Sequence, residues 1–175
     1  MTTHVLITSD THVTSGARLP TALLELADRA DHVIHAGDLV AADVHAVLGA
    51  LAPITAVHGN VDDAETARLL PERAVVEIAG VRFGVVHIPG ASEGRAERLR
   101  GWFPECDVVV YGHTHAPELR AATDGAPWII NPGSPVQKRR AAFHSAVWME
   151  LSDGRITRTD LLDLDTDGAR AANPS

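Results

Sequence analysis

The order of apolar and polar residues predicts strands alternating with helices in the first half of the chain. Short apolar runs bounded by turn residues indicate buried strands, and leucines at helical spacing opposite charged residues indicate helices. The expected strands are residues 4–9, 32–37 and 53–59, and the expected helices are residues 19–30, 41–51 and 62–70. This alternation favours a parallel sheet whose strands are joined by helical crossovers.

The second half of the chain has a different pattern, in which pairs of strand-like runs surround short turns. The expected hairpins are residues 74–88, turning at Gly80, residues 116–133, turning at "TDGAP", and residues 145–162, turning at Asp153 and Gly154. A further apolar run at residues 106–112 predicts one more strand. We therefore expect an α/β layered domain whose later strands are largely antiparallel.

Length and composition favour one domain. A chain of 175 residues with 45% hydrophobic content is long enough for one well-buried core and too short for two. We assign residues 1–162 to this domain. Residues 163–175 are predicted to form a flexible tail, because the last stretch is polar and rich in Gly, Ala, Asn and Pro.

The charge and the cysteine content limit which partners and which cellular compartment we expect for this protein. A formal charge of −8 argues against long nucleic acid, whose phosphates the average surface repels, although a metal or a basic loop still allows local phosphate binding. The single cysteine, Cys106, excludes an intrachain disulfide and a cysteine-rich zinc site. No apolar run is long enough to span a bilayer, and the first strand begins almost at the initiator Met1, so we expect a cytoplasmic protein without a membrane partner.

Two histidines, His113 and His115, follow the apolar run that ends at Tyr111. Alternate residues of an extended chain point the same way, so the two imidazoles are able to aim at one point. With ten histidines in the chain, the pair is equally compatible with a strand end that hydrogen-bonds to water. The choice depends on partners elsewhere.

Candidate partners follow the other predicted strands. They are Asp10 and His12 after the first strand, Asp38 beside His35 after the second, Asn60 near His58 and Asp62 after the third, and His87 in "VVHIPG". Each has a structural interpretation as a turn, helix-capping or surface residue. Their joint occurrence favours one crevice, because ligand sites of open α/β sheets form beyond the carboxyl ends of the strands.

The donor set indicates metal chemistry. Carboxylate, imidazole and amide oxygen suit Mn, Fe, Co, Ni or Zn, and without cysteine they exclude a structural thiolate site. Seven candidate ligands are too many for one tetrahedral zinc ion. They suit two ions that share a carboxylate, which is a common arrangement for hydrolysing phosphate esters.

The ordered series "DTH", "GD", "GN", "VVHIPG" and "GHTH" resembles the calcineurin-like metallophosphoesterases. The resemblance runs from about Val5 to Ser134, and the short length with "INPGS" is most similar to the small prokaryotic phosphodiesterase branch. It implies a four-layer α-β-β-α sandwich of two mixed β-sheets flanked by helices. It also implies a hydrolase that cleaves small phosphate esters by attack of a metal-activated water or hydroxide.

Residue by residue, the resemblance implies two divalent metal ions per chain. Asp10, His12, Asp38 and His115 would hold one ion, and Asp38, Asn60, His87 and His113 the other, with Asp38 bridging. Manganese is placed first, ahead of nickel, iron, cobalt and zinc. Asp38, Asn60 and His113 are the expected catalytic residues, together with the metal-bound water.

Two departures from the family pattern affect the expected mechanism. Val61 stands where many larger relatives have a histidine that assists the leaving group, so the general acid is unassigned. Asp62 is the nearest ionisable substitute, although we place its role as the N-cap of the next helix ahead of general-acid work. The "HIPG" segment lacks the second histidine common in small members, which leaves His87 in place but changes the mouth of the site.

Other features leave alternatives open. We interpret the basic run Lys138 to Arg140 as a solvent-exposed face, with a contact to the substrate as the alternative. Trp102 and Phe103 have three candidate roles: covering an edge of the core, forming a wall of the site, or forming a dimer contact. The last role would fit a homodimer. Besides the phosphodiesterase, we keep a phosphomonoesterase and a non-catalytic scaffold similar to the metallophosphatase-like subunit of the retromer coat. A β-lactamase-like metallohydrolase is disfavoured because Ala116 and Pro117 follow "HTH".

Overall fold

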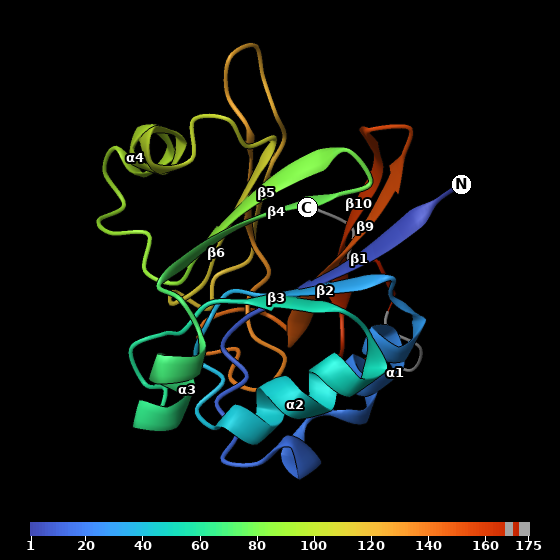
Figure 1. The fold of residues 1–175 in the computed structure, drawn as a ribbon, viewed down its shortest axis with the longest axis vertical. Helices are drawn as coiled ribbons and strands as arrows, with labels where there is room; N and C mark the ends of the chain where they lie inside the picture. The colour runs from blue at the N-terminus through green and yellow to red at the C-terminus, as the bar shows by residue number, and fades with distance from the viewer. Residues whose placement is uncertain (167–169, 172–175) are drawn as a thin grey trace.

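The computed structural model describes residues 1–166 and the backbone of residues 170–171. Two β-sheets pack face to face, and helices cover their outer faces (Figure 1). This arrangement confirms the expected four-layer α-β-β-α sandwich with mixed sheets.

The first sheet has six strands in the order β11-β10-β9-β1-β2-β3. Its strands are β1 (Thr3–Thr8), β2 (His32–His35), β3 (Ile54–Ala56), β9 (Ser145–Ser152), β10 (Arg155–Asp163) and β11 (Arg170–Ala171). The first three run parallel, as the strand-helix-strand pattern predicts, and β9 runs antiparallel to β1. The connecting helices are η1 (Gly16–Arg18), α1 (Thr21–Arg29), α2 (Ala42–Leu51) and α3 (Ala64–Leu69).

The second sheet has five strands in the order β4-β5-β6-β8-β7. The strands are β4 (Arg73–Ile78), β5 (Val81–Val86), β6 (Val108–Tyr111), β7 (Glu118–Arg120) and β8 (Trp128–Asn131), and α4 (Arg95–Trp102) joins β5 to β6. The three predicted hairpins form as β4–β5, β7–β8 and β9–β10. The expectation of largely antiparallel later strands is wrong at the centre of this sheet, where β5, β6 and β8 are parallel because longer connections separate them.

Three apolar clusters separate the layers. Alternation along β1 directs Val5 and Ile7 into the cluster between the sheets and Leu6 into the cluster under α1 and α2. A third cluster packs Leu99 and Phe103, at α4, against the outer face of the second sheet. Figure 1 shows α1 and α2 along one face of the first sheet and α4 on the far side of the second. The loops at the ends of the strands therefore start from closely packed sheets.

Several smaller predictions fall within these layers. Cys106 is half-buried two residues before β6, and Phe103 is buried against Gly84, so Phe103 belongs to the core edge. Trp102 is partly exposed and lies under the guanidinium of Arg73 at 3.9 Å. In the part of the chain that the structure describes, no helix is both long and apolar enough to cross a bilayer. The cytoplasmic location and the homodimer stay predictions.

The proposed tail begins where β10 ends. Asp163 is the last residue of β10 and pairs with Arg170 of β11. Residues 167–169 and 172–175 lie outside the described residues, so a flexible tail there, like the boundary at residue 162, stays a prediction.

Candidate metal centre

Five loops bring the predicted site residues together at one end of the two sheets. Each loop follows a parallel strand: β1 leads to Asp10 and His12, β2 to Asp38, β3 to Asn60, β5 to His87, and β6 to His113 and His115. The carboxyl ends of parallel strands meet at the same edge, so residues far apart in sequence converge there.

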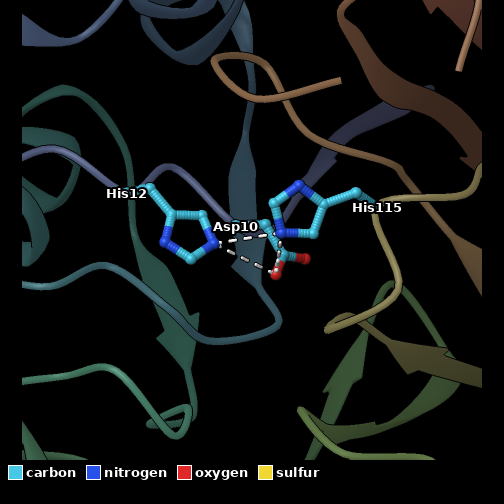
Figure 2. Close-up of side chains that lie close together, drawn as sticks. All are labelled: Asp10, His12 and His115. Atoms are coloured by element: carbon cyan, nitrogen blue, oxygen red, sulfur yellow. Dashed lines mark hydrogen bonds and ion pairs between the residues drawn. The ribbon is translucent and has the colours of Figure 1, made fainter. Parts of the chain in front are cut away.

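The first group consists of Asp10, His12 and His115, whose side chains point toward one another in Figure 2. Asp10 Oδ1 lies 3.2 Å from His115 Nε2 and 3.6 Å from His12 Nε2, and the two Nε2 atoms are 3.0 Å apart. Asp10 and His115 are buried, and His12 is partly exposed. One small ion therefore has access to all three donor atoms.

The second group joins Asp38 and His87 to Asp10. Asp38 Oδ2 lies 3.2 Å from His87 Nε2 and 3.4 Å from His12 Nε2. The same carboxylate oxygen thus faces one histidine from each group, which is the position expected of a bridging ligand.

Asn60 and His113 lie at the exposed border of these groups. Asn60 Oδ1 is 2.9 Å from His113 Nδ1, and the His113 ring stands edge-on to the His87 ring at 5.3 Å between centroids. Both residues reach the site, although the compact groups of histidine and carboxylate donors do not include His113.

The backbone at the site is held in the left-handed region. Asp10, His12, Asp38, His113 and His115 all have positive φ angles, between 45° and 71°. Such angles are uncommon for residues other than glycine and cost free energy unless the surroundings hold them. Five of the seven predicted ligands share this feature, which marks the loops as shaped for their side chains.

Two glycines allow the loops to approach one another. A Cβ at Gly112 would lie 2.1 Å from Ser9 Oγ and 2.8 Å from the Ala36 carbonyl oxygen, and a Cβ at Gly59 would lie 2.0 Å from Asp38 Oδ1. Gly112, which precedes "HTH", and Gly59, which precedes Asn60, therefore leave room for the carboxylates of Asp10 and Asp38.

Contacts that the sequence did not reveal hold the ligands in place. Ser9 Oγ donates to Asp10 Oδ2 at 2.7 Å, and Ser134 Oγ donates to the Asp10 carbonyl oxygen at 2.6 Å. His115 Nδ1 donates to the Gln137 carbonyl oxygen, and His87 Nδ1 donates to the Ala36 carbonyl oxygen at 2.7 Å. These bonds orient both imidazoles with Nε2 facing the carboxylates.

The protonation of the site follows from these contacts. Burial by itself raises the pKa of Asp10, but the contacts with His115 and His12 outweigh it and hold the pKa below its usual value. In the same way, the contact with His87 overcomes burial and lowers the pKa of Asp38. Burial lowers the pKa of His87, but Asp38 outweighs it and raises that pKa. Both carboxylates are therefore anionic at neutral pH and favour positive charge between them.

The donor set fits a divalent metal ion. His87 Nε2 is buried and has no hydrogen-bond partner among the described residues, although it faces Asp38 Oδ2. With Nδ1 donating to Ala36, a neutral His87 directs an unshared electron pair at a carboxylate oxygen, which is unfavourable unless a cation lies between them. His115 Nε2 likewise faces Asp10 Oδ1 while its Nδ1 donates to Gln137, and its nearest hydrogen-bond partner is the Nε2 of His12, another candidate ligand. Imidazole and carboxylate together suit Mn, Fe, Co, Ni or Zn.

Two neighbouring residues have structural roles. His35 is fully buried; its Nδ1 accepts from the Gly37 N–H, and its Nε2 lies 3.2 Å from Thr11 Oγ1. Asp62 is not the N-cap that we expected, since Asp63 caps α3 by accepting from the Thr66 N–H at 2.7 Å. Asp62 instead accepts from the backbone N–H groups of Val40 and Gly59, one on each oxygen.

Comparison with known proteins agrees with the fold. Residues 3–154 match the calcineurin-like phosphoesterase superfamily domain. A probable metallophosphoesterase of Methanothermobacter thermautotrophicus is 34% identical over 139 residues, which are 76% of this chain and 77% of that relative. The chain therefore belongs to the calcineurin-like phosphoesterase superfamily.

Solved structures with the same fold include both enzymes and sorting proteins. Vacuolar protein sorting 29 of Cryptosporidium parvum has a TM-score of 0.80 at 25% identity, covering 98% of this chain and 96% of that one. A novel archaeal phosphodiesterase has a TM-score of 0.68 at 25% identity, covering 91% of this chain and 99% of that one. The fold alone therefore does not decide between a phosphodiesterase and a sorting protein, so the assignment depends on the site.

Proposed function

We propose that this protein is a dinuclear-metal-dependent phosphodiesterase that hydrolyses small phosphate esters. The observation that carries the proposal is the position of Asp38 Oδ2, which faces His12 Nε2 at 3.4 Å and His87 Nε2 at 3.2 Å. A carboxylate that faces a histidine of each group suits two ions rather than one. The phosphodiesterase among the structural neighbours supports the same assignment.

The seven candidate ligands would hold two ions as the sequence predicts. Asp10, His12 and His115 would bind one ion, His87, Asn60 and His113 would bind the other, and Asp38 would contact both. When bound, divalent ions supply a water of lowered pKa as nucleophile and neutralise negative charge on the phosphoryl group. Manganese remains our first choice, ahead of Ni, Fe, Co and Zn.

The protein's own residues position the ester. The ring Nδ1–H of His113 donates to Asn60 Oδ1, which leaves Asn60 Nδ2 free to donate to a phosphoryl oxygen. In the net reaction, water adds to phosphorus, one P–O ester bond breaks, and the departing alkoxide takes the bonding pair and a proton. Asp62 is poorly placed to supply that proton, because both of its oxygens accept from backbone N–H groups.

The shape of the site favours diesters over monoesters. A hollow of about 230 Å³ borders Asn60 and His87 and is lined by His58, Glu72 and Ile88. A second hollow, of about 410 Å³, borders His115 and the residues after it. Two hollows that reach different ligands of one site provide room for both ester groups of a diester.

The test is hydrolysis of bis(p-nitrophenyl) phosphate and p-nitrophenyl phosphate by metal-stripped protein restored in turn with Mn, Ni, Co, Zn and Mg. We expect a transition metal to restore diester turnover, with a higher kcat/KM than for the monoester. The variant Asp38→Asn should lose at least about 100-fold in kcat, because the shared ligand loses its charge. Asp28→Asn, which removes an exposed carboxylate on α1, is the matched control.

Absence of turnover with every metal, while two ions bind per chain, would overturn the enzymatic assignment and favour a non-catalytic scaffold. Turnover of the monoester alone would instead indicate a phosphomonoesterase.

A further inference from the structure

The second hollow beside the metal centre carries unpaired positive charge on an acidic protein. Thr114, His115, Ala116 and Pro117 line one part of it, and Arg139, Arg140 and Ala141 line the rest. The chain as a whole has a formal charge of −8. Two consecutive arginines are therefore a local exception, and their place in a hollow that also borders His115 calls for an explanation.

The two arginines are free of carboxylate partners in the part of the chain that the structure describes. Neither Arg139 nor Arg140 takes part in an ion pair there, whereas Lys138, in the same basic run, lies 3.6 Å from Asp165. The positive charge of Lys138 is therefore partly neutralised within the protein. The charges of Arg139 and Arg140 remain available to a ligand.

The loop that carries these arginines is fixed to the metal centre. Ser134 Oγ accepts from the N–H groups of Val136 and Gln137 while it donates to the Asp10 carbonyl oxygen. The Gln137 carbonyl oxygen accepts from His115 Nδ1. Ser134 and Gln137 thus form hydrogen bonds with Asp10 and His115, respectively. These bonds join the loop to the metal centre.

Arg139 itself reaches the site. Its Nη1 lies 3.5 Å from the carbonyl oxygen of His113, and its backbone has a φ of 49°, in the left-handed region. A strained backbone beside a candidate ligand suggests that the position of Arg139 serves the site. Guanidinium groups bind phosphate through parallel N–H donors, which a lysine does not provide.

We propose that Arg139 and Arg140 form a subsite for a second phosphate group on the substrate. The inference rests on the proposed function and narrows it: the preferred substrate is a phosphodiester of which one ester group carries another phosphate. The scissile phosphate lies at the metal centre, and the second phosphate enters the hollow beside His115. The hollow beside Asn60 and His87 takes the other ester group.

The test compares ligands that differ only in the second phosphate. Binding of thymidine 5′-monophosphate and thymidine 3′,5′-bisphosphate to manganese-loaded protein is measured by calorimetry. The bisphosphate should bind at least about tenfold more tightly, since two guanidinium groups gain a charged partner, and the preference should weaken at high salt. The double variant Arg139→Gln/Arg140→Gln should bind both nucleotides with nearly equal affinity.

Arg155→Gln is the matched control, because Arg155 is an exposed arginine in the β9–β10 hairpin, at the far end of β9 from the loop that carries the arginines. It should keep the full preference for the bisphosphate. A preference that survives in the double variant, or equal binding of both nucleotides to the unmodified protein, would overturn the subsite.

Turnover separates this inference from the proposed function. The substrates are thymidine 5′-(p-nitrophenyl phosphate) with and without a 3′-phosphate. Failure to cleave either one counts against the phosphodiesterase, while the binding comparison still decides the subsite. Cleavage of both with the same kcat/KM refutes the subsite alone and leaves the phosphodiesterase standing.

Discussion

The Nε2 atoms of His12 and His115 lie 3.0 Å apart, although 103 positions separate the two residues in the sequence. Both nitrogens face Asp10 Oδ1. Nitrogen atoms that close together need a proton or a metal ion between them and the carboxylate. The loops that produce this contact follow strands of different sheets, so the sandwich itself builds the site.

Replacing either histidine should remove one metal ion and not the whole site. We expect His115→Gln to lower the manganese content, measured by elemental analysis after dialysis, from two ions per chain to one. His4→Gln, at the opposite end of β1 from Asp10, should leave the content at two. Two ions retained by His115→Gln would show that this residue is not a ligand.

Close approach of the loops should make Gly112 indispensable. Gly112→Ala places a Cβ against Ser9 and the backbone of Ala36, and we expect it to lower the free energy of unfolding by about 1–3 kcal/mol and to weaken metal binding. Gly101→Ala is the control, since Gly101 lies in α4 with nothing near its Cβ position. It should raise stability by about 0.5–1 kcal/mol, as a helical glycine does on replacement by alanine. Chemical denaturation of both variants measures these effects, and equal stabilities would refute the steric account.

Burial of His35 should produce a stability that depends on pH. Desolvation lowers the pKa of His35 to about 3, against an ordinary value of 6.5 in the unfolded chain. Below pH 6.5 the unfolded chain takes up a proton that the folded protein does not, so this contribution is complete above pH 6.5 and declines as the pH falls toward 3. In nuclear magnetic resonance spectra, the ring signals of His35 should not shift between pH 8 and 5. A midpoint near 6.5 would show that the imidazole is accessible to solvent.

The backbone contacts of Asp62 predict a structural effect without a catalytic one. Asp62→Asn loses one of its two acceptors for the N–H groups of Val40 and Gly59, and should lower the free energy of unfolding by about 1 kcal/mol. The pH profile of kcat should keep its shape. Loss of its alkaline limb in Asp62→Asn would instead identify Asp62 as the general acid. Asp63→Asn tests the N-cap separately and should leave the profile unchanged.

Much of this architecture was predictable from local patterns. Strand and helix positions follow from periodicity, and each hairpin turn contains a residue suited to it, such as Gly80 or Gly154, both with positive φ. Parallel pairing of β5, β6 and β8 was not predictable, because long-range pairing depends on which strands meet across the sheet. Placing the N-cap at Asp63 instead of Asp62 was a one-residue choice between two equally suitable caps.

The site was predictable only as a list of residues. The ordered motifs point to seven candidate ligands, since each follows a strand, but they do not reveal what orients them. Ser9 and Ser134 act through hydroxyl contacts with Asp10 that no spacing encodes. The left-handed backbone at Asp10 and Asp38 is likewise not evident from the sequence, in which only Asp38 has a neighbouring glycine, Gly37.

The most direct measurement of the central claim is a crystal structure of the manganese-loaded protein with anomalous scattering from the metal. We predict two anomalous peaks per chain, one among Asp10, His12 and His115 and one beside His87, with Asp38 between them. A single peak, or manganese bound elsewhere on the protein, would contradict the dinuclear site from which the proposed function follows.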